Sequence, residues 1–161
     1  MIKHPIPPFY DENSKILILG SFPSVKSREA QFFYGHPQNR FWKVTSAVFN
    51  EPVPQSIPER RDFLLRNHIA LWDVIASCDI QGSADSTIKN VTPNDLRIIL
   101  NTADIKEIFV NGKTAGKYYN KYTKDLINRP ATCLPSTSPA NAAWNMEKLI
   151  EAWRGINYNN T

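Results

Sequence analysis

The sequence predicts an α/β fold, a three-layer α/β/α sandwich whose central sheet has four, mainly parallel, strands. Three observations lead to this prediction. Four short segments are almost continuously apolar, which is typical of parallel strands covered on both faces. Segments with helical spacing and helix-start signals separate them, and such alternation favours a parallel sheet. The chain has 161 residues, 42% of them hydrophobic, which suffices for one domain, residues 1–161, with its own core.

The predicted strands are apolar runs that end in small or polar residues. They are KILILG (15–20), IALWDVI (69–75), EIFVNG (107–112) and ATCLPS (131–136). Between residues 76 and 91 no helix or strand pattern is evident, so we expect a long loop there, and long loops in compact domains are often functional. The last five residues, 157–161, are expected to fray.

Two predicted helices carry clear start signals. SIPERRDFLLRNH (56–68) opens with a capping box formed by Ser56 and Glu59. TPNDLRIILNTA (92–103) has Thr92 as the expected N-cap and Pro93 at the first helical position.

Three more helices fill the remaining gaps. SPANAAWNMEKLIEAW (138–153) repeats the capping device, and HPQNRFWKVTSAVF (36–49) is expected to begin its helix at Pro37. KTAGKYYNKYTKDLIN (113–128) reads less cleanly because it contains Gly116. The apolar stripe expected on the first of these is Ala143, Met146, Ile150 and Trp153.

Composition narrows the class of protein. The formal charge of +4 is a mild bias towards polyanionic partners. Cys78 and Cys133 lie in or beside apolar runs, so both are predicted to be buried reduced thiols, and neither they nor the three histidines have metal-ligand spacing. We expect no metal, no cofactor and no membrane segment, and an intracellular, cytoplasmic monomer without a signal peptide.

The candidate site follows from the fold. Open α/β sheets bind ligands at the carboxyl ends of their strands. That rule selects residues 20–24, 73–77, 111–112 and 136–138. The aromatic and polar stretch FFYGHPQNRFWKV (32–44) follows the first of them and should lie over the same edge.

Each candidate residue also has an ordinary structural reading. An amide at Asn39, in the first turn of a helix that starts at Pro37, could hold a water or the edge of a base, or it could merely cap. The ring of Tyr34 could stack on a base or belong to the core, whereas Phe41 and Trp42 are expected in the core. Asp73 could be a base or could accept loop N–H groups, and Asn111 could read a base or form a turn.

Phosphate loops, dinucleotide fingerprints and nucleophile elbows have no match in the sequence. The hydroxyls of Ser136, Thr137 and Ser138 precede a predicted helix, where they could bind phosphates. The alternative is an ordinary N-cap by Ser138.

Five motifs together resemble the uracil-DNA glycosylase superfamily, over residues 15–153. GSFPS stands at the first motif of that superfamily, and YGHPQNRFWKV is similar to a stretch of its mismatch-specific uracil glycosylases. LPSTSPANA stands at the second motif, which inserts into duplex DNA. With LWDVIASC and VNGKTA, the set most resembles the hypoxanthine-DNA (DNA-deoxyinosine) glycosylases.

The resemblance implies a uracil-DNA glycosylase-like fold, a double-stranded DNA substrate with a deaminated base, and a set of residue roles. Phe22 stands where uracil glycosylases have an acidic or amide residue that positions water, and Leu134 stands near the absent second-motif histidine. The catalytic role therefore falls on Asn39, which would orient a water at the sugar C1′. The base would be held by Gly20, Ser21, Phe22, Pro23, Tyr34, His36, Asp73 and Asn111, and the DNA by Ser24, Ser136, Thr137 and Ser138.

The predicted function is therefore base excision repair by a monofunctional glycosylase that releases hypoxanthine, without strand-cleaving lyase chemistry. Three alternatives stay open at this point. They are a mismatch-type uracil or xanthine glycosylase, a non-catalytic domain that binds damaged DNA, and a hydrolase of free nucleosides.

Overall fold

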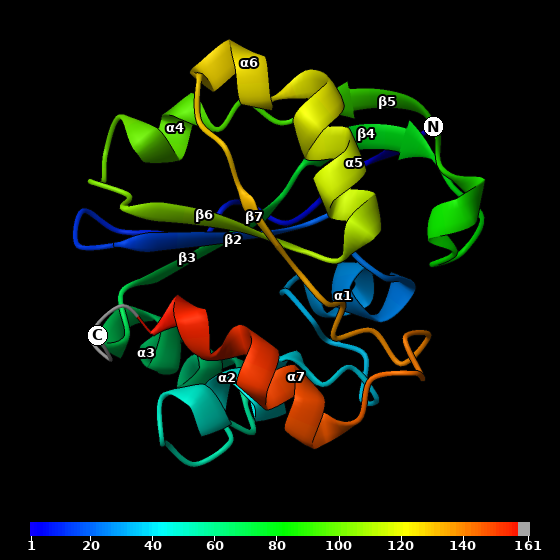
Figure 1. Ribbon diagram of the computed structural model, residues 1–161. Helices are drawn as coiled ribbons and strands as arrows, with labels where there is room; N and C mark the ends of the chain where they lie inside the picture. The colour runs from blue at the N-terminus through cyan, green and yellow to red at the C-terminus, as the bar shows by residue number, and fades with distance from the viewer. Residues whose placement is uncertain (158–161) are drawn as a thin grey trace.

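Four parallel strands form the central sheet of the computed structural model, which describes residues 1–157 (Figure 1). The strand order is β3-β2-β6-β7. Their bounds are Ile16–Gly20 (β2), Ile69–Asp73 (β3), Glu107–Asn111 (β6) and Thr132–Leu134 (β7). The four predicted strands and their parallel arrangement are thus confirmed.

Helices cover both faces of this sheet, as the predicted sandwich requires (Figure 1). On one face lie α4 (Arg97–Leu100), α5 (Lys113–Tyr122) and α6 (Lys124–Ile127). On the other lie α2 (Phe41–Val48), α3 (Ile57–Arg66) and α7 (Met146–Trp153), which the short turn η2 (Arg154–Ile156) follows. The short helix α1 (Val25–Ala30) lies beside the carboxyl ends of the strands.

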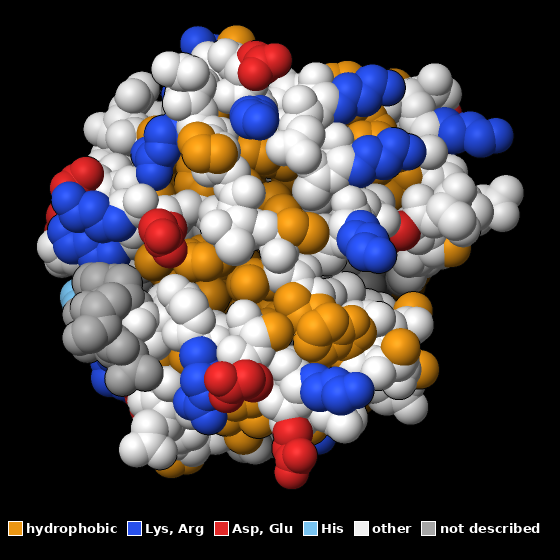
Figure 2. All heavy atoms as spheres, in the orientation of Figure 1, with side chains coloured by type: hydrophobic (Ala, Val, Ile, Leu, Met, Phe, Trp, Pro, Cys, Tyr) orange, Lys and Arg blue, Asp and Glu red, His pale blue; other side chains and the backbone are white. Residues whose placement is uncertain are grey.

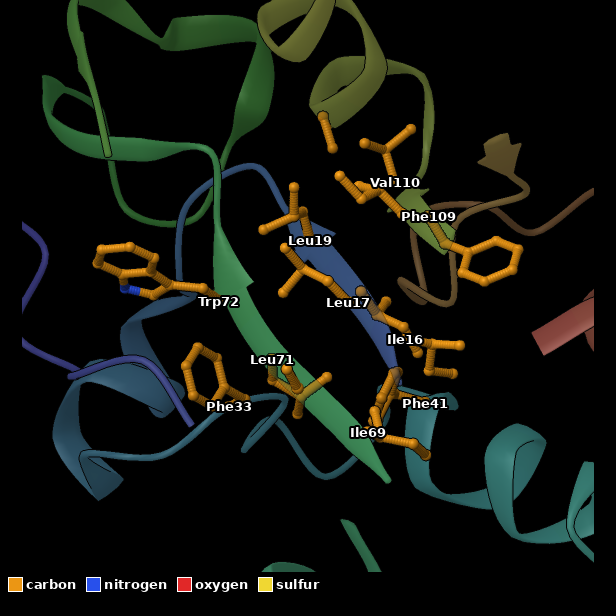
Figure 3. Close-up of a cluster of buried hydrophobic side chains, with 14 of the residues drawn as sticks. Ile16, Leu17, Leu19, Phe33, Phe41, Ile69, Leu71, Trp72, Phe109 and Val110 are labelled. Atoms are coloured by element: carbon orange, nitrogen blue, oxygen red, sulfur yellow. The ribbon is translucent and has the colours of Figure 1, made fainter. Parts of the chain in front are cut away.

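The core lies on both sides of β2, all five of whose residues are buried. Figure 3 shows side chains of β2, β3 and β6 with Phe33 and Phe41, which approach the sheet from the segment after β2. Phe41 is fully buried and Trp42 is 3% exposed, so their predicted place in the core is confirmed. Burial of aromatic side chains of this size contributes strongly to stability.

A second sheet replaces the loop predicted over residues 76–91. It is antiparallel, with the order β1-β4-β5, and its strands are Ile2–Lys3 (β1), Ile75–Asp79 (β4) and Lys89–Pro93 (β5). The run predicted as one strand over 69–75 divides at Val74, after which the chain leaves the parallel sheet. The turn η1 (Asp85–Thr87) lies in the connection between β4 and β5.

Three helix starts differ from the prediction. Thr92 and Pro93 belong to the edge strand β5, and the Asp95 carboxylate accepts the Arg97 N–H ahead of α4. The helix α7 begins after Asn145, whose side chain caps the Lys148 N–H, so Ala143 lies outside it. The start of α2 is described with the site.

Other local predictions fare differently. The predicted cap of α3 is present, because the Ser56 hydroxyl accepts the Glu59 N–H. The Glu59 carboxylate in turn accepts the Ser56 hydroxyl and the Gln55 N–H, one residue before the position that a standard capping box uses. Cys78 is buried, but Cys133 is exposed because β7 is an edge strand. The expected fraying of 157–161 concerns, beyond Asn157, residues outside the described part of the chain.

Candidate active site

A cavity of about 620 Å³ opens at the carboxyl ends of the parallel strands, a volume within the usual range of ligand sites. In Figure 1 these ends point to the right, where the segments after β2 and β7 approach each other. Residues 74–77 and Gly112, which the strand-end rule also selects, do not line this cavity. All residues for which the sequence predicted a role in catalysis or in binding do line it. They are Gly20, Ser21, Phe22, Pro23, Ser24, Tyr34, His36, Asn39, Asp73, Asn111, Ser136, Thr137 and Ser138.

Asn39 lies just before α2, not in its first turn. The helix begins at Phe41 because the Arg40 N–H is donated to the Thr137 carbonyl and the Phe41 N–H to the Asn39 side chain. The acceptor in the second bond must be Oδ1, which fixes the orientation of the amide. The amide is thus held at the N-terminal end of a buried helix, on the cavity wall.

Thr137 completes the restraint on this amide. Its hydroxyl donates to the Asn39 Oδ1 at 2.9 Å and accepts the Asn111 Nδ2 at 3.0 Å, while the Asn111 Oδ1 accepts the Thr137 N–H. The two lone pairs of the Asn39 Oδ1 are therefore occupied by Phe41 and Thr137. Within residues 1–157 the Asn39 Nδ2 makes no hydrogen bond to protein, so the group offered to the cavity is a donor.

This geometry corrects the phosphate contact expected of Thr137. Its side chain is fully buried, so its hydroxyl cannot reach a phosphate. Asn111 is a partner of Thr137 and lines the cavity as well. Ser24 caps α1, while the hydroxyls of Ser136 and Ser138 accept loop N–H groups two residues ahead. These three serines remain partly accessible at the rim.

Arg40 holds the segment after β7 in place. Its guanidinium donates to the carbonyls of Ser138, Asn141 and Trp144. A helix starting at Pro139 would use such carbonyls internally, so residues 138–144 wind in turns instead. The expected N-cap at Ser138 is therefore replaced by a clamped loop.

Tyr34 stands between the cavity and the core. One face of its ring stacks on Phe41, with ring centroids 3.9 Å apart, so only the opposite face or the edge can meet a ligand. Its backbone is left-handed (φ 51°), a conformation uncommon outside glycine and frequent at functional sites. Burial, followed by the charge of Asp73, raises the pKa of its hydroxyl, and the nearby Asn111 side chain opposes the rise. The hydroxyl is buried and makes no hydrogen bond of normal geometry within residues 1–157.

Gly20 and Asp73 meet across the register of β2 and β3. A Cβ at residue 20 would lie 2.4 Å from the Asp73 Oδ1, so only glycine lets the carboxylate pack there. The Asp73 Oδ2 binds the His4 Nε2 at 2.7 Å, and the carboxylate is almost fully buried. The ring of Phe22 packs edge-on against His4, which leaves Phe22 8% exposed at the cavity wall.

Asp85 is an ionisable cavity residue that the sequence patterns do not single out. It comes from η1, and its two carboxylate oxygens lie 3.2 and 3.3 Å from the Ser21 hydroxyl, which donates to them. Although the residue is exposed, partial desolvation at the cavity wall raises the pKa of this carboxyl, the Ser21 hydrogen bond opposes the rise, and the charge of Asp73 adds to it. The signal that could have revealed it is the polar turn QGSADS between two short half-apolar runs.

Comparison with known proteins agrees with this architecture. A sequence model of the uracil DNA glycosylase superfamily matches residues 7–157, nearly the whole chain. The chain therefore belongs to the uracil DNA glycosylase superfamily.

Similar proteins give a finer comparison. The chain is 40% identical over 121 residues to a hypoxanthine DNA glycosylase of Methanosarcina barkeri, covering 73% of this chain and 76% of that one. It is 34% identical over 158 residues to a hypoxanthine DNA glycosylase of Methanosarcina acetivorans, covering 97% and 98%. A solution NMR structure of a candidate uracil DNA glycosylase from M. acetivorans superposes with a TM-score of 0.78 at 32% identity, covering 98% of this chain and 100% of that one.

Among the described residues, no helix is both long enough and apolar enough to cross a lipid bilayer. Nor do three or more His, Cys, Asp or Glu side chains of that part cluster in a way that could hold a metal ion.

Proposed function

We propose that this protein is a monofunctional DNA glycosylase that hydrolyses the N-glycosidic bond of a deaminated base in duplex DNA, with hypoxanthine as the main substrate. The observation that carries the proposal is the Asn39 amide, which lines a cavity large enough for one base. Its Oδ1 is fixed by two donors, and its Nδ2 makes no hydrogen bond to protein among the described residues. The hypoxanthine DNA glycosylases of Methanosarcina, similar over most of the chain, support the same substrate.

The cavity residues divide into groups that would act on the base and groups that would act on the sugar. A base extruded from the duplex, at a cost of a few kcal/mol, would enter between Tyr34 and the strand-end loop 20–24. The Asn39 Nδ2 would donate to the water near C1′ or to an acceptor atom of the base. Because an amide takes no proton at neutral pH, Asn39 suits a dissociative, oxocarbenium-like path and not strong base catalysis.

The outer surface supplies cationic groups for the DNA backbone. Lys113, Lys117 and Lys121 lie four residues apart on α5, and all three are exposed. No ion pair to any of them occurs within residues 1–157. Figure 2 shows basic side chains gathered over this helix. Because α5 starts beside the cavity, this face suits a duplex that reaches past the site.

We further infer that the chain works as one glycosylase domain and as a monomer. The proposed substrate places it inside the cell, with the chromosome. The loop clamped by Arg40 would contact the duplex where the base has left, through the rim hydroxyls of Ser136 and Ser138.

A panel of duplexes with single deaminated bases tests the proposed function. Under single-turnover conditions, we expect release of hypoxanthine opposite thymine to be faster than release of uracil or xanthine, and free inosine to remain intact. Release of uracil or xanthine ahead of hypoxanthine would assign a mismatch-type glycosylase. Binding without release of any base would indicate a DNA-binding domain, and cleavage of free inosine a nucleoside hydrolase.

Replacement of Tyr34 by alanine tests the place of the base. Tyr34→Ala should weaken binding to hypoxanthine-containing duplex by about 1–3 kcal/mol, the contribution of one stacked base, and should weaken binding to undamaged duplex less. Tyr34→Phe keeps the ring and removes a hydroxyl that makes no hydrogen bond within the described part of the chain, so its binding should stay near that of the parent protein. Equal losses on both duplexes, measured by fluorescence anisotropy, would place Tyr34 in the core alone.

A further inference from the structure

The connection between β4 and β5 is fixed against the rest of the cavity. The Ser83 hydroxyl accepts the Val25 N–H at 2.9 Å, and the Arg28 guanidinium donates to the Gly82 carbonyl at 2.7 Å. The Thr87 hydroxyl closes the turn by donating to the Ala84 carbonyl. These contacts hold Asp85 at the cavity wall, where its carboxylate accepts a hydrogen bond from the Ser21 hydroxyl.

The proposed reaction needs a proton donor at the cavity, and four of the lining side chains can be compared for this role with Asp85. A purine leaves far more readily once a ring nitrogen carries a proton. The Asn39 amide donates hydrogen bonds but does not release a proton, and the raised pKa of Tyr34 keeps its hydroxyl protonated. The side chain of Phe22 has no exchangeable proton, and the Asp73 carboxylate is hydrogen-bonded to the His4 ring.

Several ionisable groups surround Asp85. Asp73 faces it from β3, Cys78 lies near it on β4, and Arg28 reaches its loop from α1. Tyr34 and His36 line the same cavity. Asp85 is exposed as a residue, but its carboxylate faces the cavity wall. Partial desolvation there and the charge of Asp73 favour the neutral acid and so raise its pKa, while the Ser21 hydroxyl favours the carboxylate.

Resting on the proposed function, we propose that Asp85 is the general acid that protonates N7 of the extruded hypoxanthine. The Asp85 O–H proton passes to N7 while the bond from C1′ to N9 breaks, and its electron pair stays on the base, which leaves neutral. Water adds to C1′ and gives one proton to solvent. The Asp85 carboxylate regains a proton from solvent after release.

The pH dependence of release provides the central test. Asp85 must be protonated in order to act, so the rate in the parent protein should fall as pH rises through its pKa. Asp85→Asn keeps the shape and the contact with Ser21 but holds no transferable proton. We expect its single-turnover release of hypoxanthine to drop on the order of 10²–10⁴-fold. The fall in rate at high pH, called the alkaline limb below, should also disappear in this variant. Asp125→Asn, on the exposed surface of α6, is the matched control and should keep the parent rate and limb.

A second variant moves the limb without removing the acid. Ser21→Ala deletes the hydroxyl that stabilises the carboxylate, so the pKa of Asp85 should rise and the limb should move to higher pH. Circular dichroism would show whether Asp85→Asn folds. If it does not fold, the shift of the alkaline limb in Ser21→Ala still tests the role of Asp85.

The outcomes separate the two proposals. A parent protein that releases no hypoxanthine would remove the proposed function itself. A parent protein that is active, together with a folded Asp85→Asn variant at the parent rate, would overturn the role of Asp85 alone. Survival of the fall in rate at high pH in Asp85→Asn, or an unmoved fall in Ser21→Ala, would likewise overturn it and would point to another proton donor at the cavity, such as the side chain of His36.

Discussion

Asn39→Ala should leave a folded protein that still binds hypoxanthine-containing duplex but releases the base on the order of 10²–10³ times more slowly, as is typical for loss of one positioned donor. The side chain is proposed to act in the transition state, so its removal should appear in the chemical step rather than in binding. The measurement is single-turnover release from a hypoxanthine–thymine duplex, with circular dichroism as the folding control.

Asn39→Asp sharpens this test. A carboxylate can still accept the Phe41 N–H and the Thr137 hydroxyl, but it lacks the Nδ2 donor. We therefore expect Asn39→Asp to release hypoxanthine no faster than the parent protein, although it can gain some activity on uracil as a better base. Parent-rate release by a folded Asn39→Ala protein would exclude Asn39 from the mechanism.

Thr137→Val should lower both stability and activity, although the two side chains have nearly the same shape. The substitution leaves the Asn111 amide and the Asn39 Oδ1 each short of a hydrogen bond inside the protein. A buried polar group without its partner costs about 1–3 kcal/mol in the free energy of unfolding. Base release should slow as well, about tenfold or more for each 1.4 kcal/mol of lost transition-state stabilisation, because the Asn39 amide loses one of its two restraints.

Thr137→Ser is the control for this variant, since it restores the hydroxyl at the same position. Urea denaturation would give the stability of each variant, and single-turnover release would give its activity. Thr137→Ser should recover most of the rate. A Thr137→Val protein that loses stability but keeps the parent rate would show that Thr137 supports the fold without positioning Asn39.

Those parts of the molecule that depend on burial could be predicted from the sequence. The five residues of β2 are apolar because both faces of the sheet are covered, and that pattern is legible in any one chain. Once the strands are placed, the strand-end rule brings Gly20, Asp73 and Asn111 to one edge, and the cavity is found there.

The parts that depend on long-range hydrogen bonds could not be predicted in the same way. Pro37 and Ser138 carry local helix signals, yet Arg40 and Thr137 take the backbone groups concerned from about a hundred residues away in sequence. The hairpin of β4 and β5 was not predicted from the sequence, because many of its side chains are partly or fully exposed and its turn has the composition of an ordinary polar loop. Asp85 was missed with it.

The hydrogen bonds from the Arg40 guanidinium to residues 138–144 affect the rate at which the protein associates with DNA. Ordering the backbone of one residue costs about 1–2 kcal/mol in conformational entropy. Because three carbonyls of this irregular segment are already bound to one guanidinium, most of that ordering takes place when the protein folds. The free protein therefore meets the duplex with the segment already shaped, and association does not have to wait for a loop to find its conformation.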